Sequence, residues 1–371
     1  MDGMDWGSRM NSAVVAALVT GGLALVVALY SAGASYRRER RLRELGFGYD
    51  NLLEIRKSEL SRVDAAHRAR TEYEYNARLS LYQRFEPTLF QLVDLSDYAL
   101  DRIRNLTEPS VWQKFALAEP SRAHSGRPPM AEAEYEMVST LYGLFAPLAL
   151  VRSMSRQLTL VDLSLEPRIE FPYYLASRIY GSFKDDRRLA AMNPQIEYDP
   201  FHPEWRARRE EDPAKYWWQG LTMGRLENVL DLFSTDGSDQ GAFRLVSFGE
   251  FERFYEKVLE SGEEWQRKDL AVAANPLVSF QPEDRPVCWR LLMAQACLYQ
   301  ALLRTSRDHS FPSTEEAWLE YLRLDDPDDF RWKAAGHTPV LDDTLLAVTE
   351  YLRRFVIGPR VANAQRPARE G

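Results

Sequence analysis

Residues 13–30 read AVVAALVTGGLALVVALY, and no charged residue occurs between Met10 and Tyr36. With its small flanking residues, this apolar run reaches the roughly 20 residues that a helix needs to cross the hydrocarbon core of a membrane. A core helix of a soluble domain would usually be shorter and would have a polar face. The run therefore predicts one transmembrane helix, over residues 12–36.

Basic residues are unevenly distributed about this run. One of them, Arg9, precedes it, and five follow it directly, namely Arg37, Arg38, Arg40, Arg41 and Arg43. Because Lys and Arg beside a span stay on the cytoplasmic side, we expect residues 1–11 outside the cell and the C-terminal domain in the cytoplasm. The same arginines could also hold anionic lipid headgroups, so membrane lipid is an expected partner.

A cleaved signal peptide is the alternative interpretation of the run, because Ala32, Gly33 and Ala34 form the small-x-small pattern of a cleavage site. The leading segment contains Asp2 and Asp5, however, whereas a signal peptide begins with a basic segment. The basic cluster also follows the run instead of preceding it. We therefore expect an uncleaved single-pass anchor in the plasma membrane. The excess of arginine over lysine is a weak indication of a bacterial source.

Small residues recur at every fourth position of the run, at Ala13, Ala17 and Gly21. Positions four apart lie on one face of a helix, and small side chains there let two helices approach closely. The stripe therefore favours self-association of the span, which makes a homo-oligomer an expected assembly. The pair Gly21 and Gly22 could instead make the helix locally flexible.

Residues 37–84 are rich in Arg, Glu, Leu and Ala and contain no proline, which predicts a long juxtamembrane helix. Gly46 and Gly48 lie inside it, and a kink or break is expected there because glycine weakens a helix. Pro87 is expected to begin the next helix, since proline is common at helix starts.

Over all 371 residues, the chain is 45% hydrophobic and 12% aromatic. The part that follows the juxtamembrane helix therefore has enough apolar residues to build a large core. Its apolar residues recur at helical spacing, and strand-like alternation is rare, so the fold class is mainly α. Prolines 194, 200, 203 and 213 favour a boundary between helical halves at 85–190 and 191–358, followed by a disordered tail at 359–371. Helices are expected near residues 131–160, 173–183, 216–234, 247–260, 285–306, 314–323 and 341–356.

Charge and cysteine usage narrow the function classes. The net charge of −8 argues against a nucleic-acid partner, because a phosphate-binding surface usually needs a basic excess. Cys288 and Cys297 are nine positions apart on one predicted helix and therefore point to opposite faces. They predict buried thiols in a reducing compartment and no disulfide.

Short catalytic motifs are absent from the sequence: it has no Walker loop, no Gly-x-Ser-x-Gly, no His-Glu-x-x-His and no Cys-x-x-Cys. Its five histidines are too far apart in sequence to suggest a metal site. The acidic cluster at residues 325–329 and the pair Asp236 and Asp239 lack the pattern of a calcium loop, so both are interpreted as solvated turns. The sequence predicts neither a cofactor nor a metal.

One basic and aromatic cluster allows two interpretations. Trp217 and Trp218 follow the basic residues Arg206, Arg208 and Arg209, and together they could stack on a ligand and contact its phosphate. The same residues could form the aromatic edge of a core beneath a charged helix surface. In an acidic chain the second interpretation is favoured.

Two functional classes remain compatible with the sequence. The first is a membrane-anchored helical protein that acts as an interaction, scaffold or signalling module at the cytoplasmic face of the membrane, with a protein partner. The alternative is a membrane-anchored enzyme or effector whose site is assembled from distant residues. The absence of catalytic motifs favours the first class.

Overall fold

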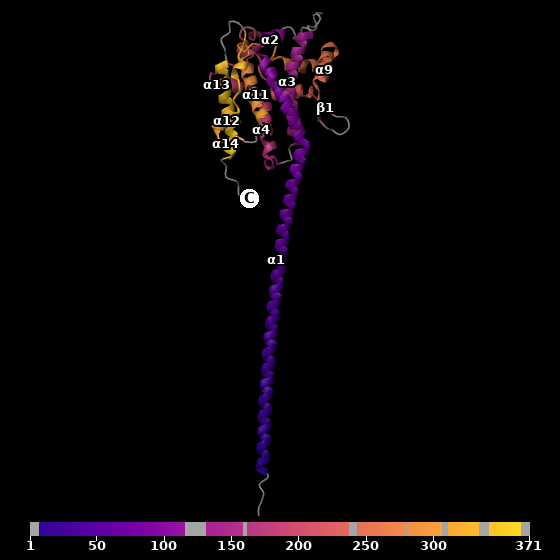
Figure 1. Cartoon of the computed structure of the whole chain (residues 1–371), viewed down its shortest axis with the longest axis vertical. Helices are drawn as coiled ribbons and strands as arrows, with labels where there is room; N and C mark the ends of the chain where they lie inside the picture. The colour runs from indigo at the N-terminus through magenta and orange to yellow at the C-terminus, as the bar shows by residue number, and fades with distance from the viewer. Residues whose placement is uncertain are drawn as a thin grey trace, which may run out of the picture. The chain divides into compact units, whose positions relative to one another are not determined.

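A computed structural model describes residues 7–115, 131–158, 162–236, 243–278, 280–305, 311–333 and 341–364. The chain is mainly helical, with 78% helix and 2% strand, as the apolar spacing predicts. It divides into two compact units, Met1–Tyr75 and Asn76–Gly371. Each unit is described by itself, and both contain part of the long helix α1 (Gly7–Asn105) (Figure 1).

The N-terminal unit consists of the first part of α1. Its large apolar side chains from Val14 to Tyr30 are between 54% and 78% exposed. The helix continues through Gly46 and Gly48, so the expected break there is wrong. A single glycine costs a helix only about 1 kcal/mol relative to alanine. Helix formation is cooperative, so the long helical segments on both sides carry the backbone through the two glycines.

The predicted helix start at Pro87 is also wrong, because Pro87 lies inside α1 and the helix goes on to Asn105. An interior proline costs a helix about 3 kcal/mol. Phe85 and Leu92, on either side of Pro87, are 1% and 0% exposed. Burying a side chain of this size stabilises by about 1.5–3 kcal/mol, so the two together offset the proline.

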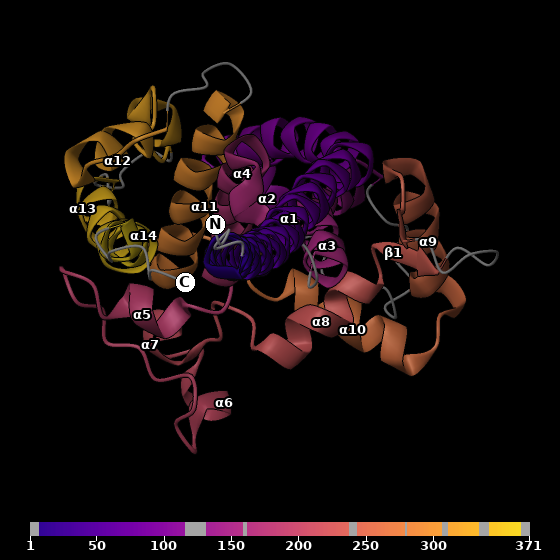
Figure 2. The same cartoon turned by 90° about the horizontal axis from the view of Figure 1, so that it is seen from below.

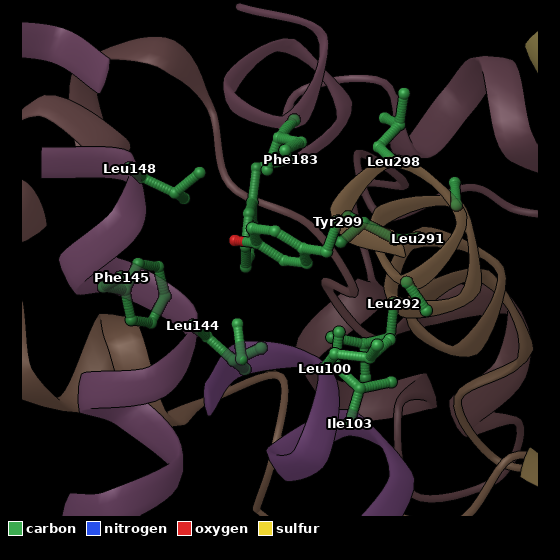
Figure 3. Close-up of a cluster of buried hydrophobic side chains, with 14 of the residues drawn as sticks. Leu100, Ile103, Leu144, Phe145, Leu148, Phe183, Leu291, Leu292, Leu298 and Tyr299 are labelled. Carbon is green, nitrogen blue, oxygen red and sulfur yellow. The ribbon is translucent and has the colours of Figure 1, made fainter. Parts of the chain in front are cut away.

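Three helices form the core of the unit Asn76–Gly371. They are α3 (Ala131–Gln157), α4 (Pro167–Ser182) and α11 (Pro286–Thr305), and α4 packs against both others (Figures 1 and 2). Figure 3 shows Tyr299 of α11 reaching toward α3, among buried side chains from four parts of the unit. These are Leu100, Ile103, Leu144, Phe145, Leu148, Phe183, Leu291, Leu292 and Leu298.

Two segments are apolar and long enough to cross a membrane, and their burial differs completely. In the segment Ala17–Arg43, none of the 18 consecutive residues with the highest hydropathy is buried. In the segment Glu134–Gln157, which belongs to α3, all 18 such residues are buried. A helix that is covered by protein on all sides is a core helix. The expectation that residues 131–160 form the central core helix is therefore confirmed.

Shorter elements complete the unit. Two short antiparallel strands pair Ser234 with Leu245. They form the one sheet found among the described residues. The remaining elements are α2 (Pro109–Phe115), α5 (Asp186–Ala190), α6 (Trp205–Arg208), α7 (Pro213–Tyr216), α8 (Met223–Asp231), β1 (Ser234–Asp236), β2 (Phe243–Leu245), α9 (Phe248–Ser261), α10 (Glu264–Ala274), α12 (Glu315–Tyr321), α13 (Leu341–Leu352) and α14 (Gly358–Ala364), with short 3₁₀ turns at Leu163–Leu165 and Pro327–Phe330 and a π turn at Arg353–Ile357.

The predicted helices near 247–260, 285–306 and 341–356 correspond to α9, α11 and α13. The helix expected from residue 216 begins only at Met223, because Trp217 is in an extended conformation. Thr314 is the N-cap of α12, and its hydroxyl accepts a hydrogen bond of 3.2 Å from the Ala317 amide.

Part of the expected disordered tail is helical, because α14 extends to Ala364. Arg360 of this helix pairs with Glu170 of α4, and Val361 packs against the hydrophobic core. Residues 365–371 and residues 1–6 lie outside the described part of the chain. The boundary predicted at residue 191 stays a prediction, although α4 and α11, from either side of it, pack against each other.

Candidate functional site

The arginines predicted to set the membrane topology lie on α1 with exposed side chains. Arg43 forms an ion pair of 2.7 Å with Glu39, one helical turn away, but both side chains are more than 60% exposed. An ion pair of this kind contributes less than about 1 kcal/mol. The side chains of Arg37, Arg38, Arg40 and Arg41 are exposed as well.

The small-residue stripe lies on the same helix. A methyl group built on Gly21 would meet no atom within 4 Å, and Ala17 is exposed. The side chain of Ala13 lies outside the described residues, although its backbone is helical. The predicted self-association of this face stays a prediction.

Both cysteines are free and buried in α11, as predicted. Burial raises the pKa of Cys288 to about 12 and that of Cys297 to about 12. A thiol that stays protonated at neutral pH is a poor nucleophile and a poor metal ligand. The two cysteines are therefore structural residues.

Three aspartates of the acidic cluster at residues 325–329 form ion pairs with arginines. Asp325 pairs with Arg304, Asp328 lies 2.8 Å from Arg331, and Asp329 lies 3.2 Å from Arg104. Among the described residues, no group of three or more His, Cys, Asp and Glu side chains could hold a metal ion. Asp239, predicted to lie in a second solvated turn, is outside the described part.

The basic and aromatic cluster lines a pocket of about 270 Å³. The lining residues belong to α6, α8 and α10 and to the segments that follow α6 and α7. Figure 2 shows α6 and α7 to the left of α8 and α10. Its walls include three tryptophans and three basic residues, which are Trp205, Trp217, Trp218, Arg209, Arg225 and Lys268. We call it the tryptophan pocket.

The backbone brings two tryptophans to the pocket by stopping α7 after one turn. Asp212 caps this helix, with its carboxylate accepting a hydrogen bond of 3.1 Å from the Lys215 amide. The chain is extended at Trp217, so Trp217 and Trp218 leave the helix axis. The Asn275 side chain at the end of α10 then donates a hydrogen bond of 3.3 Å to the Trp218 carbonyl.

Gln219 fixes the residue that follows. Its side chain is fully buried, and its amide nitrogen donates to the Ala214 carbonyl at 2.7 Å. Its carbonyl oxygen accepts from the amides of Val287 and Cys288 at 2.8 and 3.1 Å, which are at the start of α11. A helix N-terminus has amides that need acceptors, so Gln219 joins the pocket wall to the core.

Gly220, which also lines the pocket, allows its backbone to lie close to Asp186. A methyl group at Gly220 would lie 2.7 Å from the Cβ of Asp186. The Tyr198 hydroxyl donates a hydrogen bond of 2.9 Å to the Asp186 carboxylate and accepts one of 3.0 Å from the Gln219 amide. Burial raises the pKa of Asp186, while the Tyr198 hydrogen bond opposes that rise. These contacts hold the wall in one arrangement.

Arg285 supports the pocket from behind the Trp217 ring. Its guanidinium carbon lies 3.7 Å from the ring centroid, and Arg209 lies 4.8 Å from the same centroid. Arg285 is 2% exposed, and burial lowers its pKa to about 10, so it remains charged at neutral pH. The Trp217 ring nitrogen and two Arg285 nitrogens, Nε and Nη1, are buried without a hydrogen-bond acceptor among the described residues.

The pocket is positively charged although the chain is acidic. Arg209 pairs with Glu210 at 3.2 Å. Arg225, which lies 5.4 Å from the Trp218 ring centroid, and Lys268 form no ion pair with any described residue. Two cations without an ion-pair contact, beside aromatic walls, are suited to an anionic ligand.

The sequence interpretation of this cluster is only partly right. Trp217 and Trp218 are half-buried, and Arg209 reaches the pocket. Arg208 instead pairs with Glu204 at 3.1 Å, and Arg206 lies over the Trp205 ring. Sequence reasoning missed the remaining basic residues, Arg225, Lys268 and Arg285, because no spacing relates them to the tryptophans.

Comparisons of the chain with protein-family models, with curated proteins and with solved structures find no match.

Proposed function

We propose that this chain is a single-pass membrane protein whose helical unit, residues 76–371, acts as an interaction, scaffold or signalling module at the cytoplasmic face. The exposure of the uncharged run supports this proposal most strongly. Its large apolar side chains from Val14 to Tyr30 are more than half exposed, whereas α3, the other described segment that is apolar and long enough to cross a membrane, is buried. A continuous exposed apolar surface of this length is stable in hydrocarbon and not in water.

The proposed orientation follows from the positions of the basic residues. Arg37 to Arg43 would remain at the cytoplasmic surface, in contact with anionic lipid, and the short N-terminus would be outside. The stripe of Ala13, Ala17 and Gly21 would allow two copies of the anchor to associate.

The chemistry of the tryptophan pocket favours binding over catalysis. Its lining residues are Trp, Arg, Lys, Asn, Gly, Leu, Ala and Val, and Lys268 is the lining side chain that could exchange a proton. The described lining contains no carboxylate, imidazole, thiol or hydroxyl group. A module that binds a ligand or a partner requires none of these groups.

A pair of matched variants tests the anchor. We expect the full chain to remain with membranes in alkaline carbonate. Replacing Leu25 and Val26 by arginine should release it, since each arginine near the centre of a span costs about 2.5–3.5 kcal/mol. Leu52 and Leu53 are comparably exposed on α1, outside the run, and the same replacement there should leave the protein in the membrane fraction.

Reporters fused to the two ends test the orientation. Alkaline phosphatase is active only outside the cytoplasm, so a fusion after Gly371 should be inactive. A fluorescent protein fused at the same place should fluoresce, because it folds in the cytoplasm. An active phosphatase at this end would contradict the proposed topology. Extraction of the unmodified chain by carbonate would contradict the anchor itself.

A further inference from the structure

We infer that the tryptophan pocket binds a small phosphate monoester. The inference goes beyond the proposed function and does not depend on membrane anchoring, because it rests on residues 205–285 of the C-terminal unit. The ligand class follows from the charge of the pocket, its aromatic walls and its volume.

Charge is the first argument. Arg225 lies on α8 and Lys268 on α10, two helices that pack against each other, and both side chains line the pocket. Neither forms an ion pair with a described residue. A phosphate monoester carries a charge of about −1.5 to −2 at pH 7 and matches two cations, whereas a carboxylate or a sulfate ester supplies only one negative charge.

The aromatic walls are the second argument. Trp205, Trp217 and Trp218 line the pocket together with Arg209, Arg225 and Lys268. Indole rings offer a flat apolar surface to the organic part of a ligand whose anionic part meets the cations. Arg285 does not line the pocket, but its charge behind the Trp217 ring is 98% buried and poorly screened. It therefore adds to the positive potential at the pocket.

Volume is the third argument. The pocket has a volume of about 270 Å³, whereas a cavity for a single water needs only about 10–15 Å³. That space accommodates a phosphate group with a small organic substituent. It is below the range of about 300–1,000 Å³ that is typical of pockets for larger molecules. The indole rings would contact the organic part while the basic side chains bind the phosphate oxygens.

A phosphate monoester could come from solution or from a lipid headgroup such as that of phosphatidic acid. Both present the same terminal phosphate to the pocket. The two sources can be separated because only the lipid is confined to the bilayer.

Calorimetric titration of the full chain in neutral detergent tests the inference. Phenyl phosphate and phenyl sulfate have the same shape but differ by up to one charge, and we expect the phosphate to bind at least about tenfold more tightly. The double variant R225Q/K268Q should weaken phenyl phosphate binding about 10- to 100-fold. Trp217→Phe, which keeps an aromatic ring in the pocket wall and both cations, should weaken it less.

A matched control removes the same charge elsewhere. Arg253 and Lys257 are exposed on α9 and do not line the pocket, so R253Q/K257Q should bind phenyl phosphate as the unmodified chain does. Circular dichroism and the thermal midpoint verify that each variant is folded. Equal affinity for the two phenyl esters, or unchanged binding by R225Q/K268Q, would overturn the inference.

Reconstitution then identifies the source. In nanodiscs of phosphatidylcholine, phenyl phosphate should bind as it does in detergent. Adding phosphatidic acid to the nanodiscs should compete with phenyl phosphate if the natural ligand is a lipid headgroup, and should have no effect if it is a soluble monoester. Because binding is first measured in detergent, a failure here is distinguishable from a failure of the anchor, which carbonate extraction measures.

Discussion

The guanidinium group of Arg285 is stacked on the ring of Trp217, with 3.7 Å between the guanidinium carbon and the ring centroid. The contact is almost completely removed from water, because Arg285 is 2% exposed. The Arg285 Nη2 atom donates one long hydrogen bond of 3.4 Å to the Val278 carbonyl. The arginine is therefore held mainly by its contact with the ring, where cation and π system attract each other.

Substitutions at Arg285 should separate its packing from its charge. Arg285→Ala leaves a cavity beside Trp217 and should lower the free energy of unfolding by about 2–4 kcal/mol. Arg285→Met fills most of the volume without a buried charge and should change it by less than about 1 kcal/mol. Urea unfolding in detergent, followed by circular dichroism, measures both. A methionine variant as unstable as the alanine variant would show that the charge stabilises this contact.

Two glycines near the pocket should respond to alanine in opposite ways. Gly220→Ala places a methyl group 2.7 Å from the Asp186 Cβ and should destabilise the unit by about 1–3 kcal/mol. Gly224 is inside α8 and has no atom within 4 Å of such a methyl group, so Gly224→Ala should stabilise it by up to about 1 kcal/mol. Thermal unfolding of the two variants beside the unmodified chain gives the comparison. Equal midpoints would contradict the role of Gly220.

Self-association of the anchor should depend on the face that carries the small residues. Gly21→Ile places a large side chain on the stripe with Ala17 and should reduce self-association, because it prevents close approach of two helices. Gly22→Ile adds the same volume at a position about 100° away. A membrane self-association reporter fused to residues 1–43 should lose signal with the first variant and keep it with the second. Equal loss in both variants would argue against the stripe.

Alkaline pH should weaken the fold through the buried thiols. Burial raises the pKa of Cys288 and of Cys297 to about 12, above the value near 8.5 of an unfolded chain. Below the unfolded value both states keep their protons and the full stability is present. Above it the unfolded state loses protons first, so the free energy of unfolding falls until the pH passes the folded pKa.

The double variant Cys288→Ala and Cys297→Ala should therefore lose less stability than the unmodified chain between about pH 9 and pH 11. The cavity left by the alanines lowers stability equally at every pH and does not alter the slope. Urea unfolding at several pH values gives that slope. Tyr299, whose pKa burial also raises, contributes equally to both proteins. Identical slopes would show that the thiols are exposed to solvent.

The predictions that succeeded depended on local patterns. The helices α9, α11 and α13 were predictable because apolar residues recur at helical spacing within each of them. Pro87 and α10 were not predictable in this way. Burial of Phe85 and Leu92 keeps the helix intact around the proline, and α10 has few buried residues to give a repeat. At Pro87 distant contacts therefore decide the structure, whereas α10 begins with a local capping box between Glu263 and Gln266.

By itself, the sequence determined a mainly helical chain with an uncharged run long enough to span a membrane, because both properties depend on residues close together in the chain. Tertiary structure decided which of two apolar helices is buried: α3 lies inside the core and residues 17–43 do not. It also formed the tryptophan pocket, where Trp217 lies with Arg225 and Lys268, and it placed Arg285 against the Trp217 ring. Long-range packing brings these residues together, and no sequence spacing encodes that contact.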